Sequence, residues 1–261
     1  MLRSLYTAAT GMEAQQLKMD VIANNLANSS TTGFKRVRAE FQDLLSETVV
    51  QATPAGPQGG GQPVPLQVVL GVKTGSTTRS MGQGDMINTQ NPLDLAIEGA
   101  GYFRVQRPNG EIAFTRAGNL RIDETGRLVT QRGEIIEPGI TVPPETIALT
   151  IRPDGVVQAK VPTKQEPTEL GQLQVTTFTN PAALEAIGHN LFQPTGASGQ
   201  EMQLRPGEQG AGTMSQGFLE SANVKAVEEM IDMITTQRSY EMNSKVIQTA
   251  DQMLQRLTQL R

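Results

Sequence analysis

Residues that interrupt helices are distributed unevenly along this chain of 261 residues. All fifteen prolines lie between Pro54 and Pro206, Gly11 and Gly33 are the glycines that precede Pro54, and no glycine follows Gly217. Proline breaks the helical hydrogen-bond ladder and glycine favours turns, so long helices are expected at the two ends and not in the middle. The sequence therefore predicts a helix, a β-rich body and a second helix.

The first helix is expected from about Ser4 to Ala27. Apolar residues repeat every seven positions and form an a/d seam: Leu5, Met12, Met19 and Leu26, with Ile22 on an intervening position. Gly11 lies inside this helix at a cost of about 1 kcal/mol relative to alanine. A close approach by a neighbouring helix would explain that cost, and the alternative is that the glycine is simply tolerated. Asparagine accepts left-handed backbone geometry, so the helix should end within residues 24–28, before a turn through Gly33 and the apolar Phe34.

The last helix is expected from about Val224 to Leu260, with Asn223 as its N-terminal cap. Two apolar rows run along it. The first row contains Val224, Val227, Ile231, Ile234, Val246, Ala250, Met253, Leu257 and Leu260, and the second row contains Met233, Tyr240, Ile247 and Leu254. Together the rows are wider than the seam of a two-stranded coil, so this helix should contact more than one partner. Its polar middle, which includes Gln237 and Arg238, is expected to set the register of those contacts.

The middle of the chain changes character twice. Residues 48–72 carry no charge and contain four prolines and five glycines, which is typical of an extended linker or arm. From about residue 81 the apolar period becomes two, with turn signals at 108–110, 123–126 and 153–155. Strands are expected at 103–106, 112–116, 120–123, 128–131, 147–152, 156–160 and 173–178.

The fold class expected from these patterns is α+β. Long N- and C-terminal helices form a coiled-coil layer, and the central β-rich domain has a complex antiparallel topology. The expected divisions are an N-terminal helix and turn (1–35), an extended linker or arm (36–80), a β-rich body (81–217) and a C-terminal helix (218–261).

Composition excludes several classes of function. With 22 basic and 26 acidic residues the net charge is −4, which argues against nucleic acid as the main partner. The absence of cysteine excludes a disulfide framework and thiolate chemistry, and a single histidine, His189, excludes a multi-histidine metal site. The acidic pairs Asp123–Glu124 and Glu228–Glu229 are interpreted as solvated carboxylates, since no other chemical group converges on them. We therefore expect no catalytic residue, no cofactor and no metal.

Two motifs occupy the two ends of the chain. The first is Asp20-Val-Ile-Ala-Asn-Asn-Leu-Ala-Asn28, followed by Thr32-Gly-Phe-Lys35. The second is Asn223-Val-Lys-Ala-Val-Glu-Glu-Met-Ile-Asp-Met-Ile234, followed by Gln237-Arg-Ser-Tyr-Glu-Met-Asn-Ser-Lys245. Both resemble the terminal signatures of the bacterial flagellar rod and hook family.

The length and further motifs resemble the distal rod members of that family: Asp43-Leu-Leu45, Gly99-Ala-Gly-Tyr-Phe103, Thr115-Arg-Ala-Gly118 and Asp251-Gln-Met-Leu254. Proximal rod and hook proteins are the alternatives within the family, although the β-rich body is short for a hook protein. A cell-wall glycan hydrolase and a monomeric binding module are the alternatives from other classes.

The resemblance implies a structural subunit that assembles into a helical tube and transmits motor torque to the hook. It implies that both terminal helices lie in an inner layer of the tube and the β domain outside. The implied partners are further copies of the chain, proximal rod proteins, the hook protein, P-ring and L-ring proteins, the rod cap and the flagellar export apparatus, with no nucleic acid and no direct membrane insertion. The implied location is the basal body, in the rod that spans the periplasm, after export without a cleaved signal peptide.

The expected assembly interface combines the apolar rows with the residues at the helix ends. About ten large apolar side chains on the two helices represent some 15–30 kcal/mol when fully buried, and a helix pair within one monomer could bury only part of that. The alternative is an intramolecular helical hairpin that caps the β domain. We expect the first helix to pack against the first row of the last helix, within and between subunits, and the uncharged tract to lie along neighbouring subunits and keep the tube straight. The residues assigned to this interface are Leu5, Met12, Met19, Ile22, Asn24, Asn25, Leu26, Asn28, Gly33, Phe34, Val224, Val227, Ile231, Ile234, Gln237, Arg238, Tyr240, Val246, Ile247, Met253, Leu254 and Leu257.

Overall fold

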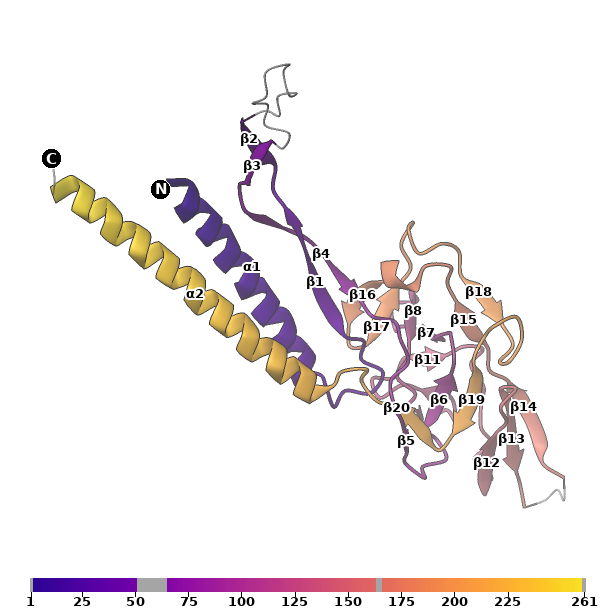
Figure 1. The fold of residues 1–261 in the computed structure, drawn as a ribbon. Coiled ribbons are helices and arrows are strands. Elements are labelled where there is room, and N and C mark those ends of the chain that lie inside the picture. Colours follow the sequence, from indigo (N-terminus) through magenta and orange to yellow (C-terminus); the bar gives the residue numbers. More distant parts are fainter. Residues whose placement is uncertain (1, 51–64, 163–165, 260–261) are drawn as a thin grey trace. The chain divides into compact units, whose positions relative to one another are not determined.

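The computed structural model describes residues 2–50, 65–162 and 166–259, and this part of the chain forms two compact units (Figure 1). Unit 1 consists of the described residues within 1–26, 37–78 and 225–261. Unit 2 consists of those within 27–36 and 79–224. The fold is α+β, as the sequence predicted, and both terminal helices are present.

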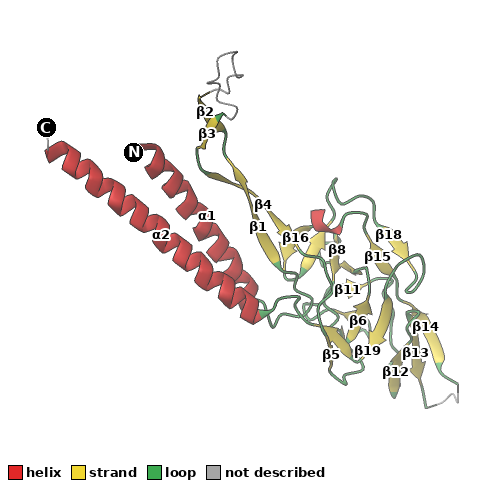
Figure 2. Cartoon of the chain, in the orientation of Figure 1, coloured by secondary structure: helices red, strands yellow, loops and turns green. Residues whose placement is uncertain are grey.

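Unit 1 contains the two long helices, drawn in red in Figure 2. Helix α1 spans Leu2–Ala27 and helix α2 spans Ala226–Gln259. The end of α1 falls inside the expected asparagine-rich segment. The expectation that Asn223 caps α2 is wrong, because α2 begins at Ala226 and the Asn223 side chain bonds elsewhere, accepting from Arg36 N and donating to the carbonyls of Ser80 and Gly82. Among the described residues, no helix combines the length and the apolar character needed to cross a membrane.

Unit 1 also contains a ribbon of paired strands where the sequence predicted a linker. Strand β1 (Val37–Asp43) pairs with β4 (Val72–Arg79), and β2 (Ser46–Val50) pairs antiparallel with β3 (Leu66–Val69). The β-branched residues flanking the proline- and glycine-rich tract favour strands, and pairing satisfies their backbone groups. The rest of the tract, residues 51–64, lies outside the described residues.

The ribbon contacts α1 through a glycine. Gly71 has φ +127°, and a Cβ there would lie 2.5 Å from Thr10 Oγ1 of α1. The same hydroxyl accepts a hydrogen bond from Val72 N at 3.4 Å. A side chain at residue 71 would therefore push the ribbon away from the helix, which explains why the chain has glycine at this point.

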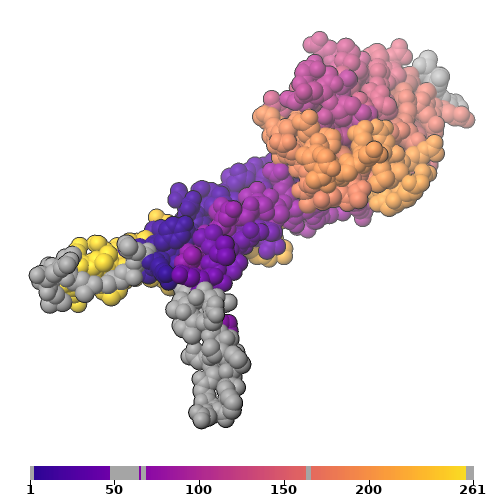
Figure 3. All heavy atoms as spheres, turned by 90° about the horizontal axis from the view of Figure 1, so that it is seen from above, coloured from indigo at the N-terminus to yellow at the C-terminus, as the bar shows by residue number. Residues whose placement is uncertain are grey.

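Unit 2 is a β body whose residues, magenta to orange, form a dense mass in the space-filling view (Figure 3). Its largest sheet has seven strands in the order β16-β17-β8-β7-β11-β10-β9, and its other sheets are β12-β13-β14, β15-β18, β19-β6 and β20-β5. Where the structure describes unit 2, its paired strands run antiparallel. The bounds are β5 Met86–Asn88, β6 Leu95–Glu98, β7 Phe103–Gln106, β8 Ile112–Thr115, β9 Arg121–Ile122, β10 Leu128–Val129, β11 Ile135–Ile136, β12 Ala148–Ile151, β13 Val156–Lys160, β14 Thr168–Gln172, β15 Val175–Thr177, the 3-10 helix η1 Pro181–Ala183, β16 Glu185–Gly188, β17 Leu191–Gln193, β18 Met202–Leu204, β19 Thr213–Gln216 and β20 Phe218–Glu220.

The expected strands and turns of the body are present. Each expected strand contains an observed one, and β7 and β13 have the expected bounds. The three expected turns close with hydrogen bonds from Gly110 N to Arg107 O, from Gly126 N to Asp123 O and from Gly155 N to Arg152 O, at 2.9–3.0 Å. The body has its own apolar core, which includes Leu95, Phe103, Val105, Leu128 and Val157, and a second cluster of aromatic rings in T-shaped contacts.

Candidate assembly interface

The helices of unit 1 meet where the sequence predicted a close approach. A Cβ on Gly11 would lie 3.0 Å from Nδ2 of Asn243, so a side chain of α2 occupies the space beside this glycine of α1. Further along α1, the buried Asn25 side chain accepts from Val37 N at 2.9 Å and donates to Val37 O at 2.8 Å and to Glu229 Oε2 at 3.2 Å. One amide therefore joins the end of α1 to the start of β1 and to α2.

The apolar seam of α1 lies on the side of the helix that faces α2. Ile22 is buried, and Leu5, Met12, Met19 and Leu26 are half-buried. On α2, the second row has Met233, Ile247 and Leu254 half-buried, while Tyr240 is 37 % exposed. Thr236 and Ala250, which share a face with this row by helical spacing, are buried.

The first row of α2 differs from the expectation. Val227, Ile231 and Ile234 are 70, 56 and 51 % exposed, and Val246 and Met253 are also exposed. These five residues are therefore not covered by α1 within one chain, whereas Ala250 of the same row is buried. The reason is geometric, since α1 covers one side of α2 and the first row lies on another. We call Val227, Ile231 and Ile234, together with the exposed Met230, the outer row.

The remaining expected interface residues fall into three groups. Asn24, Gln237 and Arg238 are exposed. Val224 and Asn28 are half-buried, and the Asn28 carbonyl and side chain accept hydrogen bonds from Thr31 N and Oγ1 at 3.0 and 3.3 Å. The side chain of Leu257 lies outside the described residues.

Gly33 and Phe34 are tied to the segment before α2. Gly33 has φ +70°, and a Cβ there would lie 2.9 Å from Ala117 N. Gly33 N donates to Glu220 O at 2.8 Å, and Asn223 N donates to Phe34 O at 3.3 Å. These two residues therefore fix a turn inside unit 2.

Beside this turn lies a buried charge cluster of Lys35, Arg116 and Glu220, which are 3, 5 and 1 % exposed. Lys35 Nζ pairs with Glu220 Oε1 at 2.7 Å and donates to Gly82 O at 2.8 Å. Arg116 Nε pairs with the second oxygen, Glu220 Oε2, and Gly84 N donates to Oε1 at 2.9 Å. One carboxylate thus neutralises part of the charge of two cations.

Arg116 also binds the carbonyls of a glycine-rich loop. Its Nη2 donates to Ile97 O at 2.9 Å and to Gly99 O at 2.6 Å, and its Nη1 donates to Gly101 O. Four hydrogen bonds therefore use four of the five N–H donors of the guanidinium. The cluster joins three motifs that are distant in sequence: Thr32–Lys35, Gly99–Phe103 and Thr115–Gly118.

The pKa values of the cluster follow from its burial and its charges. Burial alone would raise the pKa of Glu220, but Arg116 and Lys35, with their hydrogen bonds, outweigh it and hold that pKa below the ordinary value. Burial lowers the pKa of Lys35, and Glu220 opposes this effect in part. The ionised carboxylate is therefore the form that the folded chain favours.

Sequence reasoning identified Lys35 and Arg116 only as parts of motifs, and it did not identify Glu220. Glu220 is one of 26 acidic residues, and no local pattern distinguishes a buried carboxylate in a three-residue strand from an exposed one. The available signal was the occurrence of a lysine and an arginine inside glycine-containing turns, where a buried cation needs a partner.

Of the other candidate groups, His189 and Asp123 lie in turns and Glu228 lies on an exposed helix face. The expectation that Glu229 is solvated is wrong, because its side chain is buried against α1 and accepts a hydrogen bond from Asn25. His189 is exposed, with φ +57°, in the turn between β16 and β17. Glu228 pairs with Lys225 at 3.1 Å on the surface of α2. Among the described residues, no group of three or more histidine, cysteine, aspartate or glutamate side chains is placed to hold a metal ion.

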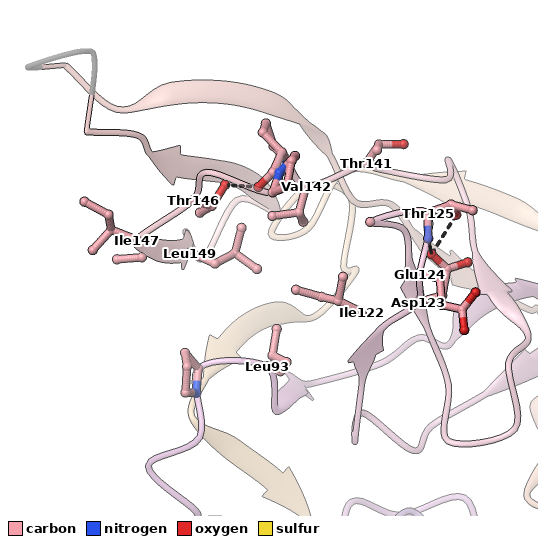
Figure 4. A pocket seen from close by; sticks show the side chains of 15 residues that line it. Leu93, Ile122, Asp123, Glu124, Thr125, Thr141, Val142, Thr146, Ile147 and Leu149 are labelled. Atoms are coloured by element: carbon pink, nitrogen blue, oxygen red, sulfur yellow. Dashed lines mark hydrogen bonds between the residues drawn. The ribbon is translucent and has the colours of Figure 1, made fainter.

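A cavity of about 640 Å³ lies in unit 2, and the apolar Leu93, Ile122 and Leu149 are among its lining residues (Figure 4). Asp123 at its edge accepts hydrogen bonds from Thr125 N and Oγ1 and from Arg127 N. The Thr125 side-chain hydrogen bond is the main reason that the pKa of Asp123 is lowered to about 2. The carboxylate is therefore ionised, and its hydrogen bonds stabilise the turn at residues 123–126 in which it lies.

Three known protein families match segments of this sequence. The family described as "Flagella basal body rod protein" matches residues 5–35, and the one described as "Flagellar hook protein FlgE/F/G D1 domain" matches residues 96–159. The one described as "Flagellar basal body rod FlgEFG protein C-terminal" matches residues 215–260. The matches therefore include most of both helices and the centre of the β body.

Individual proteins match over the full length. The flagellar basal-body rod protein FlgG of Caulobacter vibrioides is 49 % identical over 261 residues, with 100 % of both chains covered. FlgG of Borreliella burgdorferi is 47 % identical over 256 residues, with 97 % of both covered. The flagellar hook protein FlgE of Helicobacter mustelae is 44 % identical over 138 residues, which are 52 % of this chain but 30 % of that protein. The chain belongs to the family of the flagellar basal-body rod protein FlgG.

Proposed function

We propose that the chain is a structural subunit of the distal flagellar rod, and that it assembles with further copies of itself into a helical tube that transmits torque to the hook. The observation that carries the proposal is the outer row of α2. The inner side of this helix is used by α1, yet three large apolar residues within two turns remain more than half exposed. Such a surface favours association, because burying it removes apolar area from water.

Burial of the outer row can supply free energy for the association of each successive subunit. A fully buried side chain of this kind contributes about 1.5–3 kcal/mol, so four of them, each about half exposed, contribute some 3–6 kcal/mol per subunit before entropy. A tube multiplies this over every subunit. A contact between different surfaces of successive copies propagates without closing, which is the geometry of a helical polymer.

Torque transmission requires a subunit whose parts do not slip past one another. In unit 1, Asn25 fixes the end of α1 to β1 and α2, and Asn243 is packed against Gly11. In unit 2, the buried charge cluster holds the turn after α1 against the β body. We infer that the helices form the inner coiled-coil layer of the tube and that the β body lies outside.

The partners and location of the chain follow from the same proposal. Further copies, proximal rod proteins and the hook protein form the axial contacts, and the P-ring and L-ring proteins face the outer β layer. The rod cap and the export apparatus act during assembly, and export proceeds without a cleaved signal peptide into the rod that spans the periplasm. The chain has no catalytic role in this proposal. The hook alternative is disfavoured, because the matched part is 30 % of the related hook protein but 52 % of this chain.

The test is a pair of aspartate substitutions one residue apart. Ile234→Asp places a charge in the outer row, whereas Thr235→Asp places the same charge on an exposed polar residue of α2. Sedimentation and electron microscopy should show rods from the wild type and from Thr235→Asp, and none from Ile234→Asp. Circular dichroism should show the β body folded in all three proteins. Rods of normal length from Ile234→Asp would refute the assignment of the outer row to the assembly interface.

A further inference from the structure

A small cavity in unit 2 brings together two buried polar atoms that lack hydrogen-bond partners among the described residues. They are Arg104 Nε on β7 and Thr176 Oγ1 on β15. Both residues line the same cavity, of about 60 Å³, together with Glu137, Pro138, Gln174 and Gln203. The Thr176 residue is 0 % exposed, so bulk water does not reach its hydroxyl.

Neighbouring groups do not supply the missing partners. Arg104 uses its Nη1 to bind Glu137 Oε2, and its Nη2 lies 3.6 Å from Glu201 Oε1. The backbone of Thr176 is paired in both directions with Tyr102, at 2.8 and 2.9 Å, which holds the residue in place. A buried donor or acceptor without a partner is strongly unfavourable, so native proteins fill such positions with a polar ligand.

The size and charge of the cavity identify that ligand. A water molecule occupies about 30 Å³ in the liquid, so the cavity has room for about two. An anion in the cavity would meet the carboxylate of Glu137, and a cation would meet the guanidinium of Arg104. A neutral molecule that both donates and accepts is compatible with all of these groups.

We propose that this cavity is a binding site for two ordered water molecules, which join Arg104 Nε to Thr176 Oγ1 and to the side-chain amides of Gln174 and Gln203. One water accepts the hydrogen bond of Nε, and the threonine hydroxyl bonds to a water in turn. The bridge connects β7 of the seven-stranded sheet with the β15–β18 pair. It therefore links two sheets of the body through bound water, with the exposed Gln174 and Gln203 at the rim of the cavity.

The test is a structure of the full chain at a resolution that shows ordered water, for the wild type and three variants. The wild type should show water peaks about 2.7–3.2 Å from Thr176 Oγ1 and from Arg104 Nε. Thr176→Ser keeps the hydroxyl and should keep both peaks. Thr176→Val has the same shape without the hydroxyl, so it should lose the peak beside residue 176. Thr177→Val, the next residue of β15, is the control and should keep both.

Two results would overturn the site. A wild-type structure without water in the cavity would do so, as would one in which the Gln203 amide bonds directly to Thr176 Oγ1 and fills the space. Thermal unfolding of the same variants gives a second readout. The midpoint should fall further for Thr176→Val than for Thr177→Val, and equal shifts would count against a bridging role.

Discussion

Glu220 faces two buried cations, Lys35 and Arg116. Each of its oxygens has a different cationic partner, and Gly84 N donates a further hydrogen bond. In a buried cluster of this kind, removing one charge leaves the opposite charges without compensation, which is more costly than never having buried them. The turn at residues 32–35 therefore depends on one side chain that lies almost two hundred residues later in the chain.

We predict that Glu220→Gln lowers the free energy of unfolding of the β body by about 3–5 kcal/mol. Glutamine keeps the size of the side chain but leaves Lys35 and Arg116 as buried, uncompensated cations. Chemical denaturation followed by circular dichroism measures the change. Glu98→Gln, at an exposed glutamate, is the matched control and should change the stability by less than about 0.5 kcal/mol. A loss no larger than that of the control would mean that the cluster is not the main attachment of the turn.

The same residue predicts a direction of pH dependence. Because the pKa of Glu220 is lower in the folded chain than in the unfolded chain, its contribution is complete above the unfolded pKa and is lost as the pH falls through the folded pKa. When the free energy of unfolding is measured at decreasing pH, the wild type should therefore show a loss of stability, from protonation of Glu220, that Glu220→Gln lacks.

At the scale of elements, the two adjacent asparagines near the end of α1 have different roles. Both were expected to fix the helix end, yet Asn25 is buried between β1 and α2 whereas Asn24 is exposed. The Asn25 amide replaces backbone pairing for Val37 N and O. The start of the ribbon is therefore held by a side chain of the helix.

We predict that Asn25→Leu destabilises unit 1 by about 1–3 kcal/mol, because the half-buried backbone groups of Val37 lose the hydrogen bonds that the buried amide makes with them. Gln16→Leu, at an exposed amide of α1, is the matched control, with an expected change within about 0.5 kcal/mol. Urea unfolding followed by the helical circular dichroism signal compares the two. Equal effects would show that the buried Asn25 amide contributes no more than an exposed amide of the same helix.

The elements that the sequence predicted well are those with a strong local signal. The helices follow from the absence of proline, and β7 and β13 follow from apolar alternation next to clear turns. The pairing of β2 with β3 was missed, because these strands lie on either side of the proline- and glycine-rich tract, which looked like a linker. The sequence also could not predict which side of α2 faces α1. Either apolar row could pack against another helix, and only the tertiary contacts determine which row does so. The buried charge cluster has no local pattern at all.

At the scale of the whole molecule, the two units differ in how much apolar core each has. In unit 1 the buried apolar residues among those described are Ala8, Ala14, Ile22 and Ala250, of which three are alanines. Unit 2 buries large residues such as Phe103, Phe114, Leu95 and Ile97 completely or almost completely. Since burial of large side chains supplies most of the stabilisation, unit 2 can be stable in a single chain while unit 1 has less to hold it together.

We predict that hydrogen exchange will separate the units in a dilute, unassembled chain. Amides of α1 and α2 should exchange faster than those of β7 and β8, because the helices open without disturbing the core of the β body. On assembly the outer row of α2 becomes buried, and the protection of α2 should rise by one or more orders of magnitude while that of β7 and β8 stays nearly constant. The Ile234→Asp variant, at the same protein concentration, should show no such rise in the protection of α2. Helices that are already as protected as the β core in the dilute wild-type chain would mean that association is not what completes unit 1.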